Sequence, residues 1–143
     1  MNTEKILLVD DEEEFISVLA ERMQARGVKV DAVTSGADAI ERAKETFYDA
    51  VILDMAMPGM DGIETLKHLL GLNPDLQVIF LTGKATLEKA VEAVKLGALD
   101  FLEKPVKFDA LLDKIKDAKE KKILLVEKRE AERIKNIIGK KGW

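Results

Sequence analysis

The chain has 143 residues, of which 47% are hydrophobic and 35% charged, a composition typical of one globular domain of ordinary size. It contains no cysteine, which excludes disulfides and thiol chemistry and favours a cytoplasmic location. No apolar stretch approaches the roughly 20 residues that span a bilayer, and the apolar run before Asp10 is too short for a signal peptide, so no membrane partner is expected.

The net charge of −4 is unevenly distributed along the chain. Residues 119–143 hold nine Lys or Arg against four Glu, a net charge of +5, whereas residues 1–118 hold 14 basic and 23 acidic residues, a net charge of −9. Such an asymmetry indicates two parts with different roles. We therefore divide the chain into an acidic body, residues 1–118, and a basic tail, residues 119–143.

The first apolar run, Ile6–Val9, predicts a strand, because short apolar runs between helical patterns are typical of buried parallel strands. A helix is predicted after it, where Phe15, Leu19 and Met23 recur at four-residue intervals. Gly27 is expected to end this helix.

A second strand is predicted over residues 28–32, where apolar residues alternate with Lys29 and Asp31. The alternation indicates a strand with one poorer face. Residues Ser35 to Asp38 then have the form of a capping box, which predicts the start of the second helix.

The rest of the body repeats the alternation of strand and helix. Further strands are predicted over residues 50–54, 77–82 and 98–102. The helices between them are expected to end before Asn73-Pro74 and at Gly97, and a fifth helix is predicted from about Phe108.

Alternating strands and helices predict parallel pairing, because each crossover helix returns the chain to the same edge of the sheet. Five such units in residues 1–118 predict an α/β fold of the flavodoxin-like, doubly wound kind. We expect a five-stranded parallel sheet in the order 2-1-3-4-5 with five helices and a C-terminal helical extension.

Four of the predicted strands lead into polar residues that are unusual in a core. Asp10 and Asp11 follow the first strand, Asp54 ends the third, Thr82 ends the fourth, and Lys104 lies two residues beyond the fifth. In such sheets the ligand site lies beyond the carboxyl ends of the strands, so we expect these side chains to converge. Three carboxylates, a hydroxyl and an ammonium are groups that bind a divalent cation and a phosphoryl group.

These residues and the stretches around them resemble the receiver domain of response regulators in two-component signalling. The matching stretches are Asp54–Gly62, Leu81–Gly83 and Asp100–Pro105. Residues Ala85–Val106 resemble receivers of the sigma-54-activator type in particular. The resemblance covers residues 4–118 and implies that residues 1–118 form a receiver domain.

The resemblance implies that Asp54 is the phosphoacceptor, a nucleophile that takes a phosphoryl group from a phosphohistidine. The implied partner is a sensor histidine kinase or a histidine phosphotransfer protein. Asp11, Asp54 and the backbone carbonyl of Ala56 are implied to bind Mg²⁺ directly, with Asp10 holding metal-bound water, while Mg²⁺ and Lys104 neutralise charge on the transferring oxygens. The expected role is signalling, with no catalysis beyond phosphorylation and dephosphorylation of the protein itself.

Thr82 and Phe101 are the switch that the resemblance implies. The Thr82 hydroxyl would move toward the new phosphoryl group, and Phe101 would occupy the space that it leaves. The face made by the fourth helix, the fifth strand and the fifth helix would then change and control partner binding or homodimer formation. The resemblance also implies a cis peptide bond between Lys104 and Pro105.

Residues 107–138 contain no Gly or Pro, so the fifth helix is predicted to continue into residues 119–143 as a basic amphipathic tail or linker. Its apolar stripe includes Ile123, Val126 and Ile134, and an isolated amphipathic helix of this kind favours a partner. The stripe is expected to pack on the body, to pair in a homodimer or to lead to an output domain that this chain lacks. A disordered or back-folded tail is the alternative.

The tail contains a sequence repeat: Lys122–Val126 is identical to Lys5–Val9. We interpret the first copy as a strand and the second as a helix, although five residues do not decide this by themselves. DNA binding by the basic tail is not expected, because no helix-turn-helix pattern follows and Trp143 is its one aromatic residue.

Other functions remain open at this point. A phosphate sink or adaptor without output would use the same site. A phosphatase of the haloacid-dehalogenase type would need a second Asp two residues after the nucleophile, where Ala56 stands. A flavodoxin-like binder would need hydroxyl and glycine residues after the first strand, where Asp10 to Glu14 stand.

Overall fold

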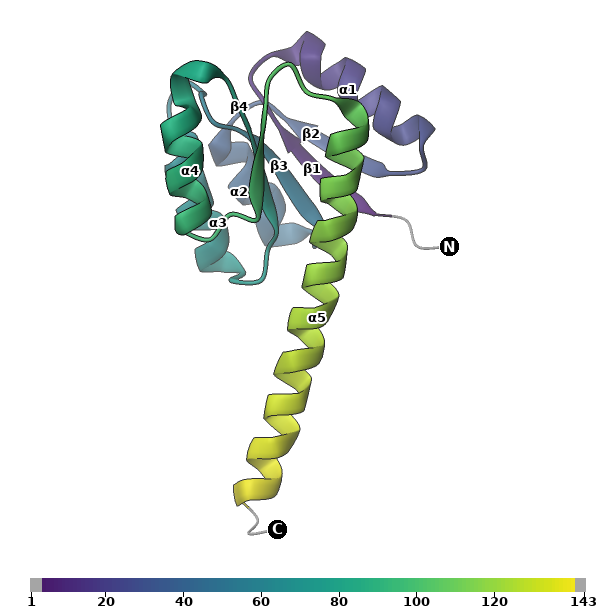
Figure 1. The fold of residues 1–143 in the computed structure, drawn as a ribbon, viewed down its shortest axis with the longest axis vertical. Coiled ribbons are helices and arrows are strands. Elements are labelled where there is room, and N and C mark those ends of the chain that lie inside the picture. The colour runs from purple at the N-terminus through teal and green to yellow at the C-terminus, as the bar shows by residue number, and fades with distance from the viewer. Residues whose placement is uncertain (1–3, 141–143) are drawn as a thin grey trace.

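The structure, a computed structural model, describes residues 4–140. Residues 1–3 of the predicted receiver domain and residues 141–143 of the predicted tail, including Trp143, lie outside the described residues. Five parallel strands form one sheet in the order β2-β1-β3-β4-β5, which confirms the predicted topology (Figure 1).

Strands and helices alternate along the chain. The strands are β1 (Lys5–Val9), β2 (Lys29–Val33), β3 (Ala50–Asp54), β4 (Val78–Thr82) and β5 (Asp100–Glu103). The helices are α1 (Glu13–Ala25), α2 (Gly36–Glu45), α3 (Gly62–Leu72), α4 (Leu87–Lys95) and α5 (Phe108–Lys140), with a short 3₁₀ helix, η1 (Lys84–Thr86), before α4.

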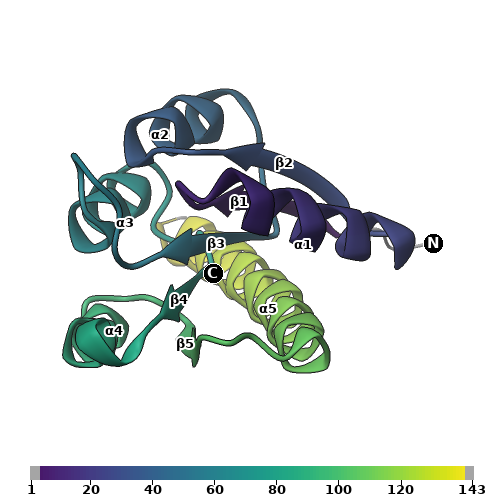
Figure 2. The same cartoon turned by 90° about the horizontal axis from the view of Figure 1, so that it is seen from above.

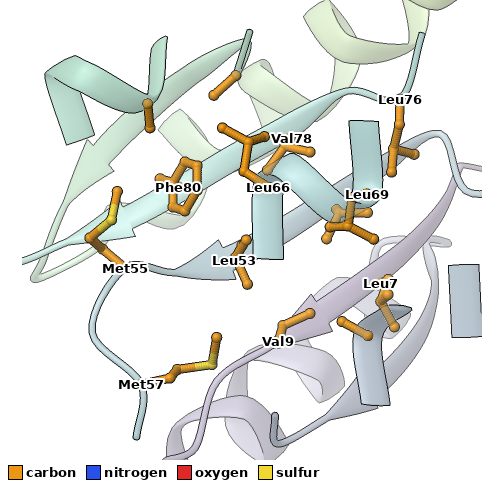
Figure 3. Packing of buried hydrophobic residues seen from close by; sticks show 14 of the residues in the cluster. Leu7, Val9, Leu53, Met55, Met57, Leu66, Leu69, Leu76, Val78 and Phe80 are labelled. Atoms are coloured by element: carbon orange, nitrogen blue, oxygen red, sulfur yellow. The ribbon is translucent and has the colours of Figure 1, made fainter. Parts of the chain in front are cut away.

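The sheet is buried on both faces. Helices α1 and α5 cover one face, and α2, α3 and α4 cover the other (Figure 2). Because side chains alternate along a strand, Ile6 and Leu8 of β1 pack toward α1 and α5, whereas Leu7 and Val9 pack toward α2 and α3. Figure 3 shows the second of these two cores, in which Phe80 and other side chains of the central strands pack together. Each continuous apolar run in the sequence therefore contributes side chains to two hydrophobic cores, one on each face of the sheet.

Three strands begin later than predicted, and the fourth differs least, because it starts at Val78 rather than at residue 77. The fifth starts at Asp100 rather than at residue 98, because the N–H of Ala98 donates to the Ala93 carbonyl at the end of α4. The second occupies residues 29–33 rather than 28–32 and lies at the sheet edge, where Asp31 accepts a hydrogen bond of 2.7 Å from the Tyr48 hydroxyl. The hydrogen bond from Tyr48 compensates the Asp31 carboxylate for its partial burial, so the strand can contain this acid.

The loop after β3 is shaped by its glycines. Gly59 has a φ of +79°, which favours glycine over any other residue. At Gly62 an added Cβ would lie 2.8 Å from the Phe80 ring, so only glycine allows this close approach. Asp61 accepts a hydrogen bond of 2.9 Å from the Glu64 N–H and caps α3, which fixes where the loop ends and the helix begins.

Helix α5 is continuous over 33 residues and extends far beyond the sheet (Figure 1). Its first turns bury Phe108, Leu111 and Ile115 against the sheet, and the part after Ala118 is largely exposed. The predicted helical extension is confirmed, and residues 119–140 are neither disordered nor folded back. The helix passes through position 118 without a break, so the division into domain and tail stays a prediction.

In the part of α5 after Ala118, three basic residues form ion pairs with acidic residues near the amino edge of the sheet. The ion pairs are Lys119–Glu4 at 3.9 Å, Lys122–Asp49 at 3.7 Å and Arg129–Asp75 at 2.9 Å. The Lys122 ammonium also donates to the Tyr48 carbonyl at 3.2 Å. Part of the basic charge of the tail therefore contacts acidic residues of the body. Within residues 4–140, no helix combines the length and the apolar character needed to cross a membrane.

Candidate functional site

Three carboxylates meet at the carboxyl edge of the sheet, as the sequence predicted. Asp10 follows β1, Asp54 ends β3, and Asp11 follows Asp10, with one oxygen of each lying within 4.8 Å of the others. Asp10 and Asp54 are 0% and 5% exposed, whereas Asp11 is exposed to solvent. Two buried acids with a third at the rim form a site that a hard cation can enter from solvent.

The Asp10 carboxylate is held by two donors. Its Oδ1 accepts a hydrogen bond of 2.9 Å from the Glu12 N–H, and its Oδ2 accepts one of 3.2 Å from the Lys104 ammonium. The Asp10 N–H in turn donates to the Val33 carbonyl of β2 at 3.2 Å. Both carboxylate oxygens are therefore engaged by the protein itself.

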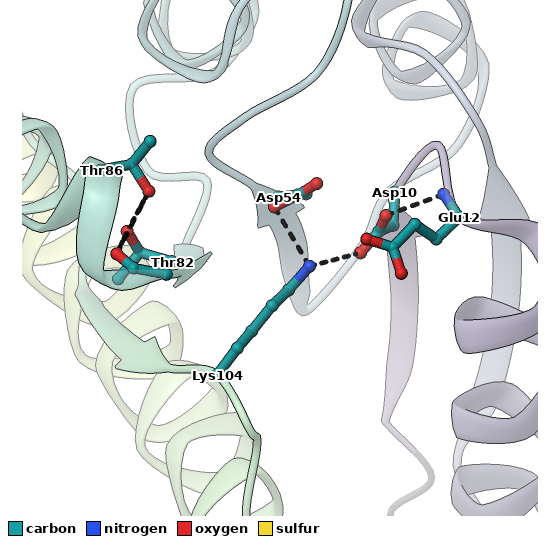
Figure 4. A network of polar contacts seen from close by, with 7 residues as sticks. Asp10, Glu12, Asp54, Thr82, Thr86 and Lys104 are labelled. Carbon is teal, nitrogen blue, oxygen red and sulfur yellow. Dashed lines mark hydrogen bonds and ion pairs between the residues drawn. The ribbon is translucent and has the colours of Figure 1, made fainter.

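Lys104 lies between the two buried acids (Figure 4). Its Nζ is 3.2 Å from Asp10 Oδ2 and 3.4 Å from Asp54 Oδ1. The backbone N–H of Lys104 donates to the Thr82 carbonyl at 2.7 Å, and the Lys104-Pro105 peptide bond is cis, as expected. The Phe15 ring, which the sequence reading assigned only to a helix face, lies 4.9 Å from the ammonium.

The charges of this cluster are unbalanced. Burial, together with repulsion from Asp10, raises the pKa of Asp54 to about 6, against the lowering effect of Lys104 and of the Ala56 backbone. Burial disfavours the charge on Lys104, but attraction to Asp54 and Asp10 outweighs it and raises the pKa of that ammonium. Like charges about 4 Å apart repel by roughly 4 kcal/mol at an effective dielectric of 20, so one ammonium leaves an excess of negative charge for a cation to neutralise.

Thr82 ends β4 at the same edge and is fully buried. Its hydroxyl oxygen lies 2.6 Å from the Thr86 hydroxyl oxygen and 3.2 Å from the Gly83 carbonyl oxygen, and it is directed away from Asp54 (Figure 4). The structure thus brings the three acids and Lys104 into one cluster, whereas the Thr82 hydroxyl is hydrogen-bonded outside it. The contact with Thr86 was missed, because it depends on the tight turn of η1 rather than on a sequence pattern.

Phe101 and Ala56 occupy the positions that the sequence indicated. Phe101 is in β5, opposite Phe80 of β4, and is half-buried against the core under α2, α3 and α4. Ala56 is exposed in the loop after β3, two residues beyond Asp54. The proposed roles of both depend on a phosphorylated state and a bound metal.

The fold and this edge define a class of protein: a doubly wound α/β domain with a cluster of carboxylates and one lysine at the carboxyl edge of its sheet. The family model of the response regulator receiver domain matches residues 6–116. The chain belongs to this family and is the receiver domain of a two-component response regulator. Members of the family depend in general on Mg²⁺.

The relatives extend beyond the receiver. The transcriptional regulatory protein ZraR of Escherichia coli is 42% identical over 106 residues, which is 74% of this chain and 24% of ZraR. The C4-dicarboxylate transport transcriptional regulatory protein DctD of Rhizobium meliloti is 34% identical over 128 residues, 90% of this chain and 28% of DctD. The chain thus spans about a quarter of the length of these curated relatives.

Among solved structures, a response regulator receiver domain protein from Clostridium thermocellum superimposes with a TM-score of 0.83 at 33% identity, over 85% of this chain and 98% of that one. The phosphatase and flavodoxin-like alternatives are not supported by these relationships. Neither is the expectation that DNA binding is absent, because ZraR and DctD are named as transcriptional regulatory proteins.

Proposed function

We propose that Asp54 accepts a phosphoryl group from the phosphohistidine of a sensor histidine kinase or a histidine phosphotransfer protein. The observation that carries this proposal is the position of Asp54, buried at the end of β3 with Lys104 3.4 Å from its Oδ1. Phosphorylation then switches partner binding or self-association. A cytoplasmic location stays a prediction from the sequence.

The reaction follows from the groups in the site. A carboxylate oxygen of Asp54 attacks phosphorus in line, the bond to the imidazole nitrogen of the donor breaks, and that nitrogen keeps the electron pair and takes up a proton. With a pKa of about 6, the Asp54 carboxyl is mostly ionised at pH 7 and so is ready to attack. Lys104 stabilises charge on the transferring oxygens. Water later hydrolyses the aspartyl phosphate, so the chain catalyses only its own phosphorylation and dephosphorylation.

The donor atoms fit Mg²⁺, which takes oxygen ligands and keeps several waters. We assign Asp11, Asp54 and the Ala56 carbonyl as direct ligands. Asp10 acts through metal-bound water, since both of its oxygens already accept hydrogen bonds from the protein. When bound, Mg²⁺ supplies positive charge to the phosphoryl oxygens.

A groove beside the site is the proposed contact for the histidine-bearing partner. It lies between α1 and the start of α5, with Phe15, Val18, Val106 and Phe108 among its lining residues. Phe15 connects the groove to the site through its contact with Lys104, and Val18 is 59% exposed. A donor that reaches Asp54 from this edge would cover the groove, which favours the phosphohistidine partner as its occupant.

The proposed output surface is made by α4, β5 and α5. Leu87, Val91 and Val94 are at least partly exposed at helical spacing along α4. On α5, Lys122 and Arg129 contact the body, and the stripe that begins with Ile123 and Val126 is left exposed. We propose that this stripe pairs with the same stripe of a second copy, since two such helices bury each other's apolar side chains.

The direct test is phosphorylation by acetyl phosphate with Mg²⁺, followed by mass spectrometry. One phosphoryl group, stable in acid and labile in base, is expected at Asp54, and Asp54→Asn should remain unlabelled. Equal labelling of Asp54→Asn would end the assignment of an acyl phosphate at this position.

A further inference from the structure

The Thr82 hydroxyl is held by a residue outside the expected switch. The Oγ1 atoms of Thr82 and Thr86 lie 2.6 Å apart. The Gly83 carbonyl oxygen lies 3.2 Å from the Thr82 oxygen and 3.4 Å from the Thr86 oxygen. Figure 4 shows this group beside the start of α4, apart from Asp54 and Lys104.

The two hydroxyl protons of Thr82 and Thr86 are both used within this group of hydrogen bonds. Each threonine hydroxyl donates one proton, and both protons are used among the three oxygens whichever hydroxyl donates to the other. Thr82 therefore has no proton left for another acceptor. To donate to a phosphoryl oxygen on Asp54, it must give up its bond to Thr86 or to Gly83.

Thr86 is also the residue that precedes α4. Threonine at this position commonly caps a helix by accepting a hydrogen bond from a backbone N–H of the first turn. Here the φ and ψ of Thr86 are −116° and 11°, and its side chain makes no capping bond, because the hydroxyl is turned toward Thr82. Loss of the contact with Thr82 would free the Thr86 hydroxyl for α4.

We infer that Thr86 is a positioning residue, which holds the Thr82 hydroxyl away from Asp54 before phosphorylation and links its release to the first turn of α4. The inference rests on the proposed role of Asp54 as phosphoacceptor. Through α4 the change reaches the exposed Leu87 and Val91. Thr86 thus connects the end of β4 to the proposed output surface.

The test compares Thr86→Val, which removes the hydroxyl at nearly constant shape, with Thr86→Ser, which keeps it. The side-chain rotamer of Thr82 is measured by NMR three-bond couplings in the unphosphorylated protein. Thr86→Val should raise the ratio of released to held rotamer by roughly 2- to 12-fold, the factor that one net hydrogen bond supplies. Thr86→Ser should retain the parent ratio. Thr86→Ala removes the same hydroxyl and repeats the measurement if valine distorts the turn.

An unchanged rotamer ratio in both Thr86→Val and Thr86→Ala, or an equal shift in Thr86→Ser, would overturn the inference. Acetyl phosphate with Mg²⁺ should move Thr82 to the released rotamer in the parent, with a smaller further change in Thr86→Val. Mass spectrometry of the same samples reports on Asp54 separately. A failure of the proposed function therefore appears as missing label, and a failure of the inference appears as an unshifted rotamer.

Discussion

The Lys104 ammonium lies 3.2 Å from Asp10 Oδ2, although 94 residues separate the two in the chain. The same ammonium is 3.4 Å from Asp54 Oδ1, so one cation is shared by two buried acids. The carboxyl edge of a parallel sheet makes this possible, because β1, β3 and β5 all end there. In the metal-free protein, the site therefore keeps an excess of negative charge, which should affect its stability and its affinity for Mg²⁺.

Asp54→Asn should stabilise the metal-free protein at neutral pH. The pKa of Asp54 is raised from 3.8 to about 6 on folding, so its contribution to stability is fully present below about pH 4 and is lost as the pH rises through 6. Asparagine does not titrate, and the gain over the parent should grow from pH 4 to pH 7 to at most about 3 kcal/mol. Urea unfolding at a series of pH values in chelator measures the difference.

Asp113→Asn is the matched control, because it makes the same chemical change on the exposed surface of α5. It should leave the unfolding free energy within about 0.5 kcal/mol of the parent. A difference between Asp54→Asn and the parent that stays constant from pH 4 to pH 8 would show that Asp54 is not held among like charges.

Asp11→Asn should weaken Mg²⁺ binding with little effect on metal-free stability, because Asp11 is exposed at the rim of the acidic cluster. Mg²⁺ at 100 times its dissociation constant should stabilise the parent by about 2.7 kcal/mol. In the variant, the Mg²⁺ concentration that gives this effect should rise at least roughly tenfold. Thermal unfolding against Mg²⁺ concentration measures the shift, with Glu13→Gln as a nearby acidic control. The same Mg²⁺ dependence in Asp11→Asn and the parent would remove Asp11 from the ligand set.

Val18→Asp should slow phosphorylation by a histidine kinase but not by acetyl phosphate. A charge in the groove beside α1 should lower kcat/KM for phosphotransfer from a histidine kinase at least roughly tenfold, and should leave the rate with acetyl phosphate unchanged. Val91→Asp places the same charge on α4, where the side chain is 44% exposed, and should not affect either donor. Equal rates for Val18→Asp and the parent with the kinase would mean that the partner docks elsewhere.

Removal of residues 120–143 should abolish a dimer and leave phosphorylation intact. The 33-residue helix is about 50 Å long, and its exposed stripe lies in the removed part. In the full chain, Ile134→Glu with Ile138→Glu should have the same effect, whereas Asn136→Glu, on the opposite side of the helix, should not.

Sedimentation velocity at matched concentration measures the masses. If the full chain and both altered forms sediment alike, α5 has no pairing role. If phosphorylation also alters neither mass nor partner contact, the protein acts as a phosphate sink or adaptor.

Much of the site could be predicted, because its residues lie at the ends of strands that the sequence marks clearly. Asp10, Asp54 and Lys104 follow apolar runs or short motifs, and parallel topology alone requires these ends to share one edge. The Thr82–Thr86 contact could not be predicted in this way. It depends on the local turn of η1 and on which rotamer each threonine adopts.

The ion pairs between the end of α5 and the body likewise could not be predicted from the sequence. The basic excess of the tail was visible, but Arg129 meets Asp75 only because a continuous helix passes the amino edge of the sheet. The sequence gives the number of charged residues in a segment. It does not give their ion-pair partners, because these depend on the direction in which the helix leaves the body.

The sequence by itself determined the alternation of strand and helix and the polar residues at the strand ends, because both are encoded in local hydrophobic patterning. The two copies of Lys-Ile-Leu-Leu-Val show what it did not determine. Lys5–Val9 is the buried strand β1, and Lys122–Val126 is part of α5. Identical side chains adopt both forms because the first copy is hydrogen-bonded between β2 and β3, whereas the second continues a helix that began on the sheet at Phe108.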